Sequence, residues 1–452
     1  GVTCMNRTYD VVILGSGVAG GVAARKLKAG GLSVAMLEPG SLGGTCPLRG
    51  CEPKKVMFDA VDALVRCEHQ NGHGLQGKPD LDWPELVRFK NSFTDPVPGL
   101  IEKDLAKRDI DVLSGQGRFV SPDTIQAGDQ SITGSRILIC TGATSRPLDI
   151  PGAEHITPSY HFFDLDSLPR RMAVIGGGYI AFEFAHLAVR AGVQVDLLVR
   201  SDWCLRAFDP DLVQILVEHS RELGIRIHFN APLDHIQKQD KAYLVSAGQG
   251  AVSIETDLVL HGAGRVPNVD GLDCPKGDVE VSKYGIVVNE YLQSVSNPFV
   301  YAAGDVVATG PQLTPVALME AEVVAANVLQ KGPIQVDYTG IPSILFTHPV
   351  MARTGLLESE CSRQGLEYTV YWADASRWAS YKRLGEKVAG VKILVNPQTD
   401  EVLGAHVLGR NAEEVVNTFA LAIQQGISRT KLVQTVWSYP SFVYDTVRHV
   451  LA

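Results

Sequence analysis

The first forty residues alternate apolar runs with glycines. Residues 11–14 are apolar, three spaced glycines follow, and a helical stretch continues to about Leu27. After Gly30 and Gly31, a second apolar run covers residues 32–37. Short apolar runs bounded by glycine are typical of buried strands. The pattern therefore predicts a strand, a tight turn, a helix and a second strand over residues 10–38.

The same pattern returns 161 residues later, with Gly176 in the place of Gly15. Residues 172–175 form the apolar run before the glycines, and a helical stretch ends at Arg190. A second predicted strand covers residues 193–199. Strands that alternate with helices are typical of parallel α/β sheets. The repeat therefore predicts an α/β protein with two Rossmann-like dinucleotide-binding domains.

Other segments predict elements of several kinds. Residues 40–70 are expected to be helical after an irregular start, and residues 74–98, rich in Gly, Pro and Asp, to form a loop with one short helix. Beyond residue 333 no glycine-rich turn recurs, which predicts a C-terminal α+β domain. Further expected elements are short strands within 110–145, strands at 299–302, 343–347, 367–373, 389–395 and 402–408, and helices at 315–329, 412–425 and 429–435.

Composition narrows the class of protein. The chain has 452 residues, 45% of them hydrophobic and 20% charged, which fits about three globular domains. A net charge of −9 argues against nucleic acid or an anionic membrane as the main partner. No apolar run is long enough to span a bilayer, and the first ten residues hold no apolar leader. The eight cysteines are sparse and irregularly spaced, so a cytoplasmic protein with free thiols is expected.

The first glycine turn carries a dinucleotide-binding pattern. Gly15, Gly17 and Gly20 follow one strand, and Glu38 ends the next. Such glycines permit a tight turn and let backbone N–H groups approach a pyrophosphate at the helix N-terminus. An acid in the place of Glu38 accepts hydrogen bonds from ribose hydroxyls. The first site therefore suits an unphosphorylated adenosine ribose.

The second turn differs at the position that contacts the ribose. Its glycines, residues 176–178, lead into the GxGxxA form of the motif, and Val199 stands where the first unit has Glu38. Arg200 follows, and Arg206 comes six residues later. An acid would repel a 2′-phosphate, whereas arginines bind it. The second site is therefore predicted to bind NADPH, and the alternative is that both arginines are solvated surface charges.

Cys46 and Cys51 are the two cysteines that lie close together in the sequence. In a regular helix their Cα atoms would be about 8–9 Å apart, which is too far for a disulfide. Pro47 and Gly50 lie between them and Pro53 just beyond, so a distorted, bridgeable turn is expected. A close pair in a cytoplasmic protein is more often catalytic or redox-sensing than structural.

Positive charge around the pair, from Arg49, Lys54 and Lys55, favours a thiolate. Two alternatives stay open: a pair of unpaired thiols, or a metal site. The metal site would need further ligands from Cys67, His69 and His73.

These motifs together resemble the class I pyridine nucleotide–disulfide oxidoreductase family, which includes glutathione reductase, dihydrolipoyl dehydrogenase and mercuric reductase. The resemblance covers nearly the whole chain. It implies FAD in the first site, NAD(P)H in the second, and a C-terminal dimerisation domain that makes a homodimer. The motifs that carry it are GSGVAG at 15–20 with Glu38, GGTCPLRGCEPKK at 43–55, TGA at 141–143, GGGYIAFE at 176–183, GRVPN at 264–268 and YAAGD at 301–305.

The resemblance also implies domain boundaries and roles. It divides the chain into an FAD-binding part (1–155), an NADPH-binding domain (156–270), a second FAD-binding or central part (271–338) and a dimerisation domain (339–452). The implied FAD residues are Gly15, Gly17, Gly20, Glu38, Gly44, Thr45, Lys54, Gly117, Thr141, Gly142, Arg265, Gly304, Asp305 and Thr314. The implied NADPH residues are Gly176, Gly178, Tyr179, Ile180, Glu183, Arg200, Arg206 and Gly264.

The implied catalytic residues act on both sides of the flavin. By resemblance, Cys51 is the thiolate beside the flavin and Cys46 is the thiol that attacks the substrate. Lys54 pairs with Glu183 near the flavin N5, although Glu183 would otherwise be a solvated helix acid. Tyr179 resembles the residue that gates the nicotinamide pocket. NADPH is expected to reduce FAD, which reduces the Cys46–Cys51 disulfide, and the dithiol then reduces the substrate.

The chain departs from the family near its C-terminus. Tyr439 stands where disulfide reductases have a catalytic histidine, and Tyr444 where they have its glutamate. A phenol with a pKa near 10 is a poor base at neutral pH, but it can donate a proton or a hydrogen bond. Glutathione specificity is weakened because Glu322 replaces a substrate-binding arginine, although Arg25 matches another.

Three functions remain open from the sequence. The first is reduction of a small-molecule disulfide through Cys46 and Cys51. The second is reduction of another electron acceptor, a metal ion or a quinone, on the same flavin. The third is a redox-sensing flavoprotein without turnover. No resident metal is expected in any of them.

Overall fold

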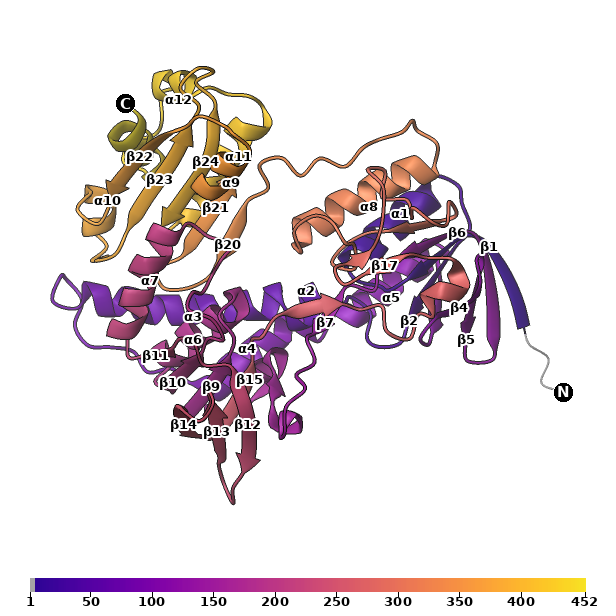
Figure 1. Ribbon diagram of the computed structural model, residues 1–452, viewed down its shortest axis with the longest axis horizontal. Helices are drawn as coiled ribbons and strands as arrows, with labels where there is room; N and C mark the ends of the chain where they lie inside the picture. The colour runs from indigo at the N-terminus through magenta and orange to yellow at the C-terminus, as the bar shows by residue number, and fades with distance from the viewer. Residues whose placement is uncertain (1–4) are drawn as a thin grey trace. The chain divides into compact units, whose positions relative to one another are not determined.

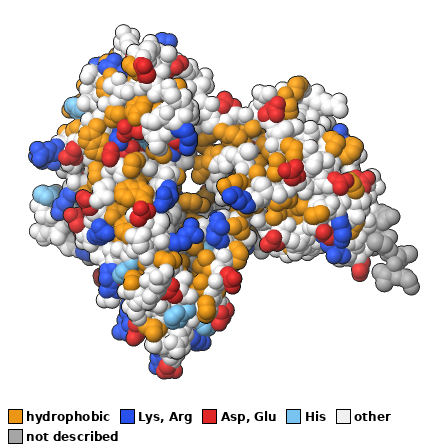
Figure 2. All heavy atoms as spheres, in the orientation of Figure 1, with side chains coloured by type: hydrophobic (Ala, Val, Ile, Leu, Met, Phe, Trp, Pro, Cys, Tyr) orange, Lys and Arg blue, Asp and Glu red, His pale blue; other side chains and the backbone are white. Residues whose placement is uncertain are grey.

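The computed structural model describes residues 5–452, which form two compact units. The first unit contains the described residues up to 56, residues 88–146 and residues 265–338. The second contains residues 57–87, 147–264 and 339–452. In each unit, acidic and basic side chains are interspersed on the face drawn in Figure 2.

The first unit is built on a seven-stranded sheet. Its strands and the smaller pairs beside it are β1 (Met5–Leu14), β2 (Val34–Glu38), β3 (Asp111–Ser114), β4 (Arg118–Ser121), β5 (Thr124–Ala127), β6 (Gln130–Ile139), β7 (Ala143–Ser145), β16 (Arg265–Pro267), β17 (Val281–Ser282), β18 (Gly285–Ile286) and β19 (Val300–Ala302). The order is β3–β2–β1–β6–β5–β4, with β19 also paired to β6. β1 is parallel to both β2 and β6, as the strand–helix–strand pattern requires.

Helices cover this sheet. They are α1 (Val18–Ala29), α2 (Thr45–Arg49), α5 (Val97–Lys107), α8 (Thr314–Val328) and the short turn η3 (Cys274–Gly277), while α3 (Cys51–Gln70) and α4 (Trp83–Thr94) contain residues of both units. α1 and α8 pack against each other (Figure 1). Gly30 allows the close approach, because a Cβ there would lie 2.3 Å from the Leu329 side chain. The apolar faces of strands and helices form one buried core.

The second unit contains two five-stranded sheets and a smaller three-stranded sheet. Its strands are β8 (Thr157–Pro158), β9 (Arg171–Ile175), β10 (Gln194–Leu198), β11 (Arg226–His228), β12 (Leu233–Lys238), β13 (Tyr243–Ala247), β14 (Val252–Thr256), β15 (Leu258–His261), β20 (Ser343–Leu345), β21 (Met351–Gly355), β22 (Thr369–Asp374), β23 (Gly390–Val395) and β24 (Val402–Leu408). The parallel sheet runs β11–β10–β9–β15–β8, and the C-terminal antiparallel sheet runs β20–β21–β24–β23–β22. β12, β13 and β14 form a three-stranded antiparallel sheet.

The helices of this unit are α6 (Tyr179–Arg190), α7 (Pro210–Glu222), α9 (Glu358–Arg363), α10 (Ala379–Lys382), α11 (Ala412–Gln424), α12 (Arg429–Gln434) and α13 (Phe442–Thr446), with the short turns η1 (Ala153–His155), η2 (Ser159–Asp164) and η4 (Val447–Leu451). α11 packs on the antiparallel sheet (Figure 1). The predicted fold class is therefore confirmed: two parallel α/β folds and an α+β C-terminal domain.

One prediction from the pattern holds only in part. Residues 74–98, expected to form a loop with one short helix, contain the twelve-residue helix α4 and also the start of α5. Pro84 and Pro98 caused the error, because each stands at the second position of its helix. A proline in the first turn costs no helical hydrogen bond, so it marks a helix start there and not a break. Among the described helices, none has the length and hydropathy of a membrane span.

Candidate functional site

The first glycine turn has a backbone that larger residues could not adopt. Gly15 has a φ of +103°, and a Cβ there would lie 2.4 Å from the Cys140 carbonyl oxygen. A Cβ at Gly20 would lie 2.0 Å from the Gly15 carbonyl oxygen. Gly17 caps α1. Because these positions carry no side chains, the N–H groups at the N-terminus of α1 can be approached closely. This arrangement suits a pyrophosphate.

Glu38 is held in place by three hydrogen bonds. Its Oε2 accepts from Ser16 N at 3.0 Å and from Ser16 Oγ at 2.7 Å, and its Oε1 accepts from Gly40 N at 2.9 Å. Ser16 Oγ also accepts from Gly43 N at 3.1 Å. Ser16 thus joins the glycine turn, the acid and the start of the cysteine loop, and sequence reasoning missed it. Its place between two motif glycines was the available signal.

The cysteine loop lies directly against the glycine turn. Gly44 has a φ of +70°, and a Cβ there would lie 2.7 Å from the Gly17 Cα. Thr45 Oγ1 accepts a hydrogen bond from Arg265 at 3.5 Å, and Arg265 also donates to the Ala143 carbonyl. The structure therefore brings together the predicted FAD residues Gly17, Gly44, Thr45 and Arg265.

The cysteine pair straddles the predicted break in the helix. α2 ends at Arg49, Gly50 has φ −132° and ψ −107°, and α3 begins at Cys51. Neither cysteine forms a disulfide in this structure, and Cys46 is half-buried whereas Cys51 is exposed. A hydrogen bond with Cys51, and then burial, raise the pKa of Cys46. The pair is thus in direct contact, and this contact favours the protonated form of Cys46.

Thr314, the first residue of α8, contacts this pair. Its Oγ1 lies 3.4 Å from Cys51 Sγ. The hydroxyl also bonds to Cys46 and partly offsets the rise in the pKa of that thiol. The contact could not be predicted from the sequence, because 263 positions separate Cys51 from Thr314.

Asp305 and Gly304 follow β19 at the C-terminal edge of the sheet, where nucleotides bind in open α/β folds. Burial raises the pKa of Asp305, and Arg265 opposes that rise. Gly304 N donates to Glu320 Oε2 at 2.6 Å, and Tyr338 Oη donates to Glu320 Oε1 at 2.6 Å. Burial raises the pKa of Glu320 to about 7. Sequence reasoning missed this buried acid beside Asp305, one of the implied FAD residues.

The other predicted FAD residues have partners of their own. Thr141 Oγ1 donates to the Asn268 carbonyl at 2.7 Å, and Gly142 has a φ of +68°. A Cβ at Gly117 would lie within 3.0 Å of three apolar side chains, so close packing alone requires glycine there. Lys54 is half-buried in the first turns of α3.

The second glycine turn replaces a polar contact of the first by an apolar one. A Cβ at Gly176 would lie 2.1 Å from the Gly262 carbonyl oxygen. Gly177, the counterpart of Ser16, packs against Val199, the counterpart of Glu38, because a Cβ there would lie 2.7 Å from Val199 Cγ1. Val199 is buried, so it offers a ribose no acceptor.

The remaining predicted NADPH residues surround this turn. Tyr179 begins α6 and is 43% exposed, and Ile180 is half-buried. Gly178 has open space where a Cβ would be, and Gly264 has a φ of +96°. Arg200 and Arg206 are exposed on the loop after β10. Arg206 lies 3.4 Å from Asp202.

Glu183 is a buried acid. It is 3% exposed on α6, and its Oε1 accepts from Phe346 N at 2.9 Å. The alternative of a solvated helix acid is therefore wrong. Lys54 belongs to the other unit, so its pairing with Glu183 stays a prediction.

Tyr439 lies in an exposed stretch before α13. The side chain is 70% exposed, and its ring centroid is 5.0 Å from that of Tyr444, edge to face. The two phenols predicted at the histidine and glutamate positions therefore touch each other within one chain.

The residues bearing on glutathione specificity are engaged elsewhere. Arg25 donates to Asp104 at 2.7 Å, and Glu322 lies 3.0 Å from Lys26. Both are ion pairs at the surface of the first unit. Arg25 thus has the environment of an ion-paired helix residue.

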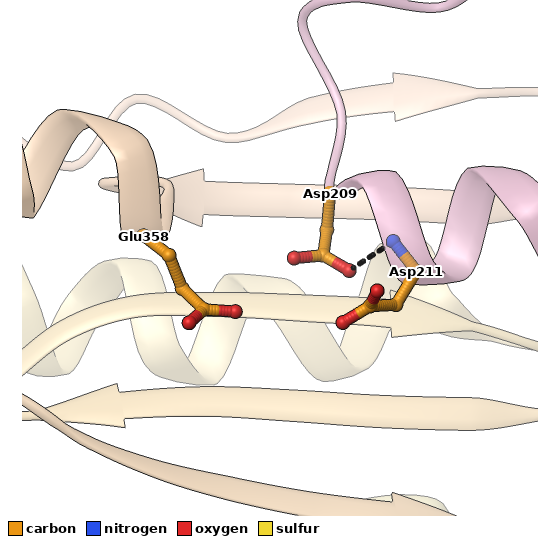
Figure 3. Close-up of side chains that lie close together, drawn as sticks. All are labelled: Asp209, Asp211 and Glu358. Atoms are coloured by element: carbon orange, nitrogen blue, oxygen red, sulfur yellow. Dashed lines mark hydrogen bonds between the residues drawn. The ribbon is translucent and has the colours of Figure 1, made fainter.

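The open metal alternative gains no support. His69 faces Glu386 at 3.7 Å. Within residues 5–452, the group of ligand atoms close enough for an ion is Asp209, Asp211 and Glu358 (Figure 3). The ammonium of Lys392 lies within ion-pair distance of all three carboxylates, so their charge already has a partner.

Comparisons with known proteins agree with this geometry. Residues 9–321 match the model of the pyridine nucleotide-disulphide oxidoreductases, and residues 341–448 match the dimerisation domain of that family. The chain is 34% identical to mercuric reductase of Staphylococcus aureus, over 95% of this chain and 80% of the relative. It is 31% identical to glutathione reductase of Nostoc sp., over 98% of this chain and 99% of the relative.

A solved structure shows the same fold. A Cu(II) complex of a variant of the HOCl-induced flavoprotein disulfide reductase RclA from Escherichia coli is 25% identical, with a TM-score of 0.89 over 99% of both chains. The family uses FAD and NAD(P)H. Glycine turns, cysteine pair and dimerisation domain together place this chain in the pyridine nucleotide-disulphide oxidoreductase family of NAD(P)H-dependent flavin enzymes.

Proposed function

We propose that this protein is an NADPH-dependent FAD enzyme that reduces a small disulfide through Cys46 and Cys51. The observation that carries the proposal is the contact of the two thiols beside Thr314, at the start of α3 and α8. The substrate need not resemble glutathione, because the two positions that bear on glutathione specificity, Glu322 and Arg25, are both held in surface ion pairs.

The first unit fits FAD. Gly15, Gly17 and Gly20 leave the backbone space that a pyrophosphate needs, and Glu38 is oriented for a ribose. Asp305 is a half-buried carboxylate at the sheet edge. When bound, FAD supplies a two-electron relay between a nicotinamide and the cysteine pair.

The two cysteines divide the work. Cys51 lies at the N-terminus of the twenty-residue helix α3, and the helix dipole there favours a thiolate. Cys46 keeps its proton because its pKa is raised by Cys51 and by burial. In the dithiol, Cys51 is therefore the natural base that takes the proton of Cys46 when Cys46 attacks.

The exchange balances in two steps. Cys46 sulfur attacks one sulfur of the substrate disulfide while its proton passes to Cys51. A mixed disulfide forms, and the first substrate sulfur takes that proton back from Cys51 and leaves as a thiol. Cys51 sulfur then attacks Cys46, which re-forms the intramolecular disulfide and releases the second thiolate. The dithiol loses two electrons and the substrate gains them.

Spectroscopy of the FAD-loaded protein tests the roles of the cysteines. Anaerobic titration with NADPH should produce a long-wavelength absorption band from a thiolate beside the oxidised flavin. Cys51→Ser should abolish the band. Cys46→Ser should show the band even before NADPH is added, because Cys51 then has no disulfide partner. A band that survives Cys51→Ser would overturn the assignment. The buried Cys274 offers a matched control, since Cys274→Ser should leave the band unchanged.

The preference for NADPH rests on Arg200 and Arg206. Both are exposed on the loop that packs on the second glycine turn, and the position of an acid is taken by the buried Val199. Arg200→Glu with Arg206→Ala should move the ratio of kcat/KM toward NADH. Unchanged selectivity would identify the two arginines as solvated surface charge.

Reduction of a thiophilic metal ion is the second candidate. It is favoured by Tyr439 and Tyr444, because a phenol is a poor base for thiol exchange and metal binding by two thiolates needs no histidine base. The ion is then the substrate, and it receives two electrons that come from NADPH. Mercuric reductase is among the relatives of this chain.

Steady-state turnover with a disulfide panel, Hg(II) and quinones separates the candidates. Disulfide turnover that is lost in Cys46→Ala supports the first candidate, and Hg(II) turnover lost in the same variant supports the second. Quinone turnover that survives this variant indicates direct flavin chemistry. Absence of turnover with every acceptor would leave a redox sensor.

A further inference from the structure

The loop that carries Arg200 and Arg206 is fastened on two sides. On the Rossmann side, Leu205 N donates to the Gly177 carbonyl at 2.8 Å, which ties the loop to the glycine turn. On the other side, Arg353 of β21 donates to the Ala207 carbonyl. The C-terminal domain therefore holds the backbone immediately after Arg206.

A buried lysine holds the end of the same loop. Lys392 of β23 is 2% exposed, and its Nζ lies 2.9 Å from Asp209 and 2.7 Å from Glu358. It also donates to Asp211. Figure 3 shows the three carboxylates converging from α9, from α7 and from the residue before α7.

Asp209 links this cluster to the loop. It is 1% exposed and caps α7, accepting from Asp211 N at 3.1 Å and Leu212 N at 3.2 Å. Only two residues separate Asp209 from Arg206. A buried carboxylate needs a counter-charge, so Asp209 can hold the end of the loop only while Lys392 is in place.

The loop needs such anchors because its backbone is strained. Leu205 has a φ of +48°, a left-handed conformation that is unfavourable for a non-glycine residue. Without fixed ends, the loop would have to be ordered each time a ligand binds. That ordering would weaken binding through Arg200 and Arg206.

We propose that Lys392 and Arg353, from the dimerisation domain, are positioning residues for the 2′-phosphate of NADPH. They act through the loop of residues 200–209, which they hold in the conformation that presents Arg200 and Arg206. The inference rests on the proposed NADPH preference. It assigns part of the cofactor selectivity to the C-terminal domain, outside both Rossmann-like folds.

Binding of adenosine nucleotides to the FAD-loaded protein tests the inference. The probes are 2′,5′-ADP, which carries the 2′-phosphate, and 5′-AMP, which lacks it, both measured by calorimetry. Arg353→Gln should raise the Kd for 2′,5′-ADP about fivefold and leave that for 5′-AMP unchanged. Lys392→Met should also raise the Kd for 2′,5′-ADP and not that for 5′-AMP. In both variants the KM for NADPH should rise, whereas the KM for NADH should not.

Arg171→Gln is the matched control. Arg171 is also an ion-paired arginine of the second unit, but it begins β9, at the end of the strand opposite the glycine turn. Its loss should leave the ratio of the two Kd values unchanged. If Lys392→Met does not fold because Asp209 is left unpaired, Arg353→Gln decides the question.

Two failures can be told apart. A wild-type protein that binds both probes equally would overturn the NADPH preference itself. A wild-type protein that prefers 2′,5′-ADP, and loses that preference in Arg200→Glu with Arg206→Ala but not in Arg353→Gln, would overturn this inference alone. An equal rise of both Kd values would also overturn it, because it indicates general loosening of the domain.

Discussion

A single residue distinguishes the two glycine turns. Ser16 lies between Gly15 and Gly17 and bonds both to Glu38 and to Gly43 N, whereas its counterpart in the second turn, Gly177, packs on an apolar side chain. Because Ser16 is buried, nothing but these partners satisfies its hydroxyl. The serine therefore orients the acid that faces the nucleotide.

Ser16→Ala should weaken FAD binding. It leaves Glu38 with one donor fewer and Gly43 N without an acceptor, at a cost of about 1–3 kcal/mol. The expected result is a roughly tenfold or larger increase in the Kd of FAD, measured by fluorescence after reconstitution of the apoprotein. Ser33→Ala removes a comparable but exposed bond to Asp10 and should leave that Kd unchanged. Equal effects of both changes would contradict the role of Ser16.

Glu320 should make stability depend on pH. Burial raises its pKa from 4.5 to about 7. Between these values the folded protein holds a proton that the unfolded chain has released, so stability falls as pH rises through this window and levels off above it. The cost is at most about 3 kcal/mol.

Glu320→Gln removes this dependence. The melting temperature of the variant, relative to wild type, should therefore rise as the pH increases from about 5 to about 7.5. Scanning calorimetry at a series of pH values measures the difference. A constant difference across the window would show that Glu320 titrates near its ordinary value.

Whole elements depend on how closely they approach one another. In the first turn the helix crosses so near the strand that the third motif position must be glycine, since a Cβ at Gly20 would lie 2.0 Å from the Gly15 oxygen. The second turn has Ala181 there, and the neighbouring strand end supplies Gly262 instead. The motif therefore varies with the strand that faces it.

Gly20→Ala should displace α1 from β1 and abolish FAD retention. The contact is with backbone, which cannot move aside as a flexible side chain could, so the loss of stability should be several kcal/mol, as in other overpacked cores. Gly99→Ala is the control, because Gly99 lies in α5 with open space around it. That change should stabilise α5 by about 0.5–1 kcal/mol. Thermal unfolding and flavin content of the purified variants measure both.

The C-terminal domain exposes apolar side chains that suit a partner subunit. Val436 is 93% exposed, Tyr439 is 70% exposed and Leu421 is 55% exposed. The family's dimerisation domain covers residues 341–448. Such exposure agrees with the homodimer that the sequence analysis predicts.

Val436→Lys should weaken a dimer. A charge in an apolar contact is left without a partner, so the dimer Kd should rise at least about tenfold in sedimentation experiments. Val295→Lys, at a 52% exposed position of the first unit, should have no effect on association. A wild-type protein that sediments as a monomer would contradict the proposal.

Much of this molecule could be predicted from the order of its residues. Periodicity and glycine spacing predicted both parallel folds and both nucleotide turns, because these depend on local backbone geometry and on short apolar runs. Cys46 and Cys51 could likewise be identified as a pair from their spacing and from the breaker Gly50. The extent of α4 and α5 was underestimated, since a proline begins a helix or interrupts one, although the helix that starts beside Pro315 was predicted.

Contacts between distant segments were beyond such reasoning. The approach of Thr314 to Cys51, the burial of Glu183, and the hold of Lys392 on Asp209 join residues more than 150 positions apart. Nothing local requires these pairs, because packing of the folded chain determines which side chains lose water and which charges meet. The motifs alone therefore predicted the kind of chemistry. Which side chains contact the motif residues was determined only by the packing of the folded chain.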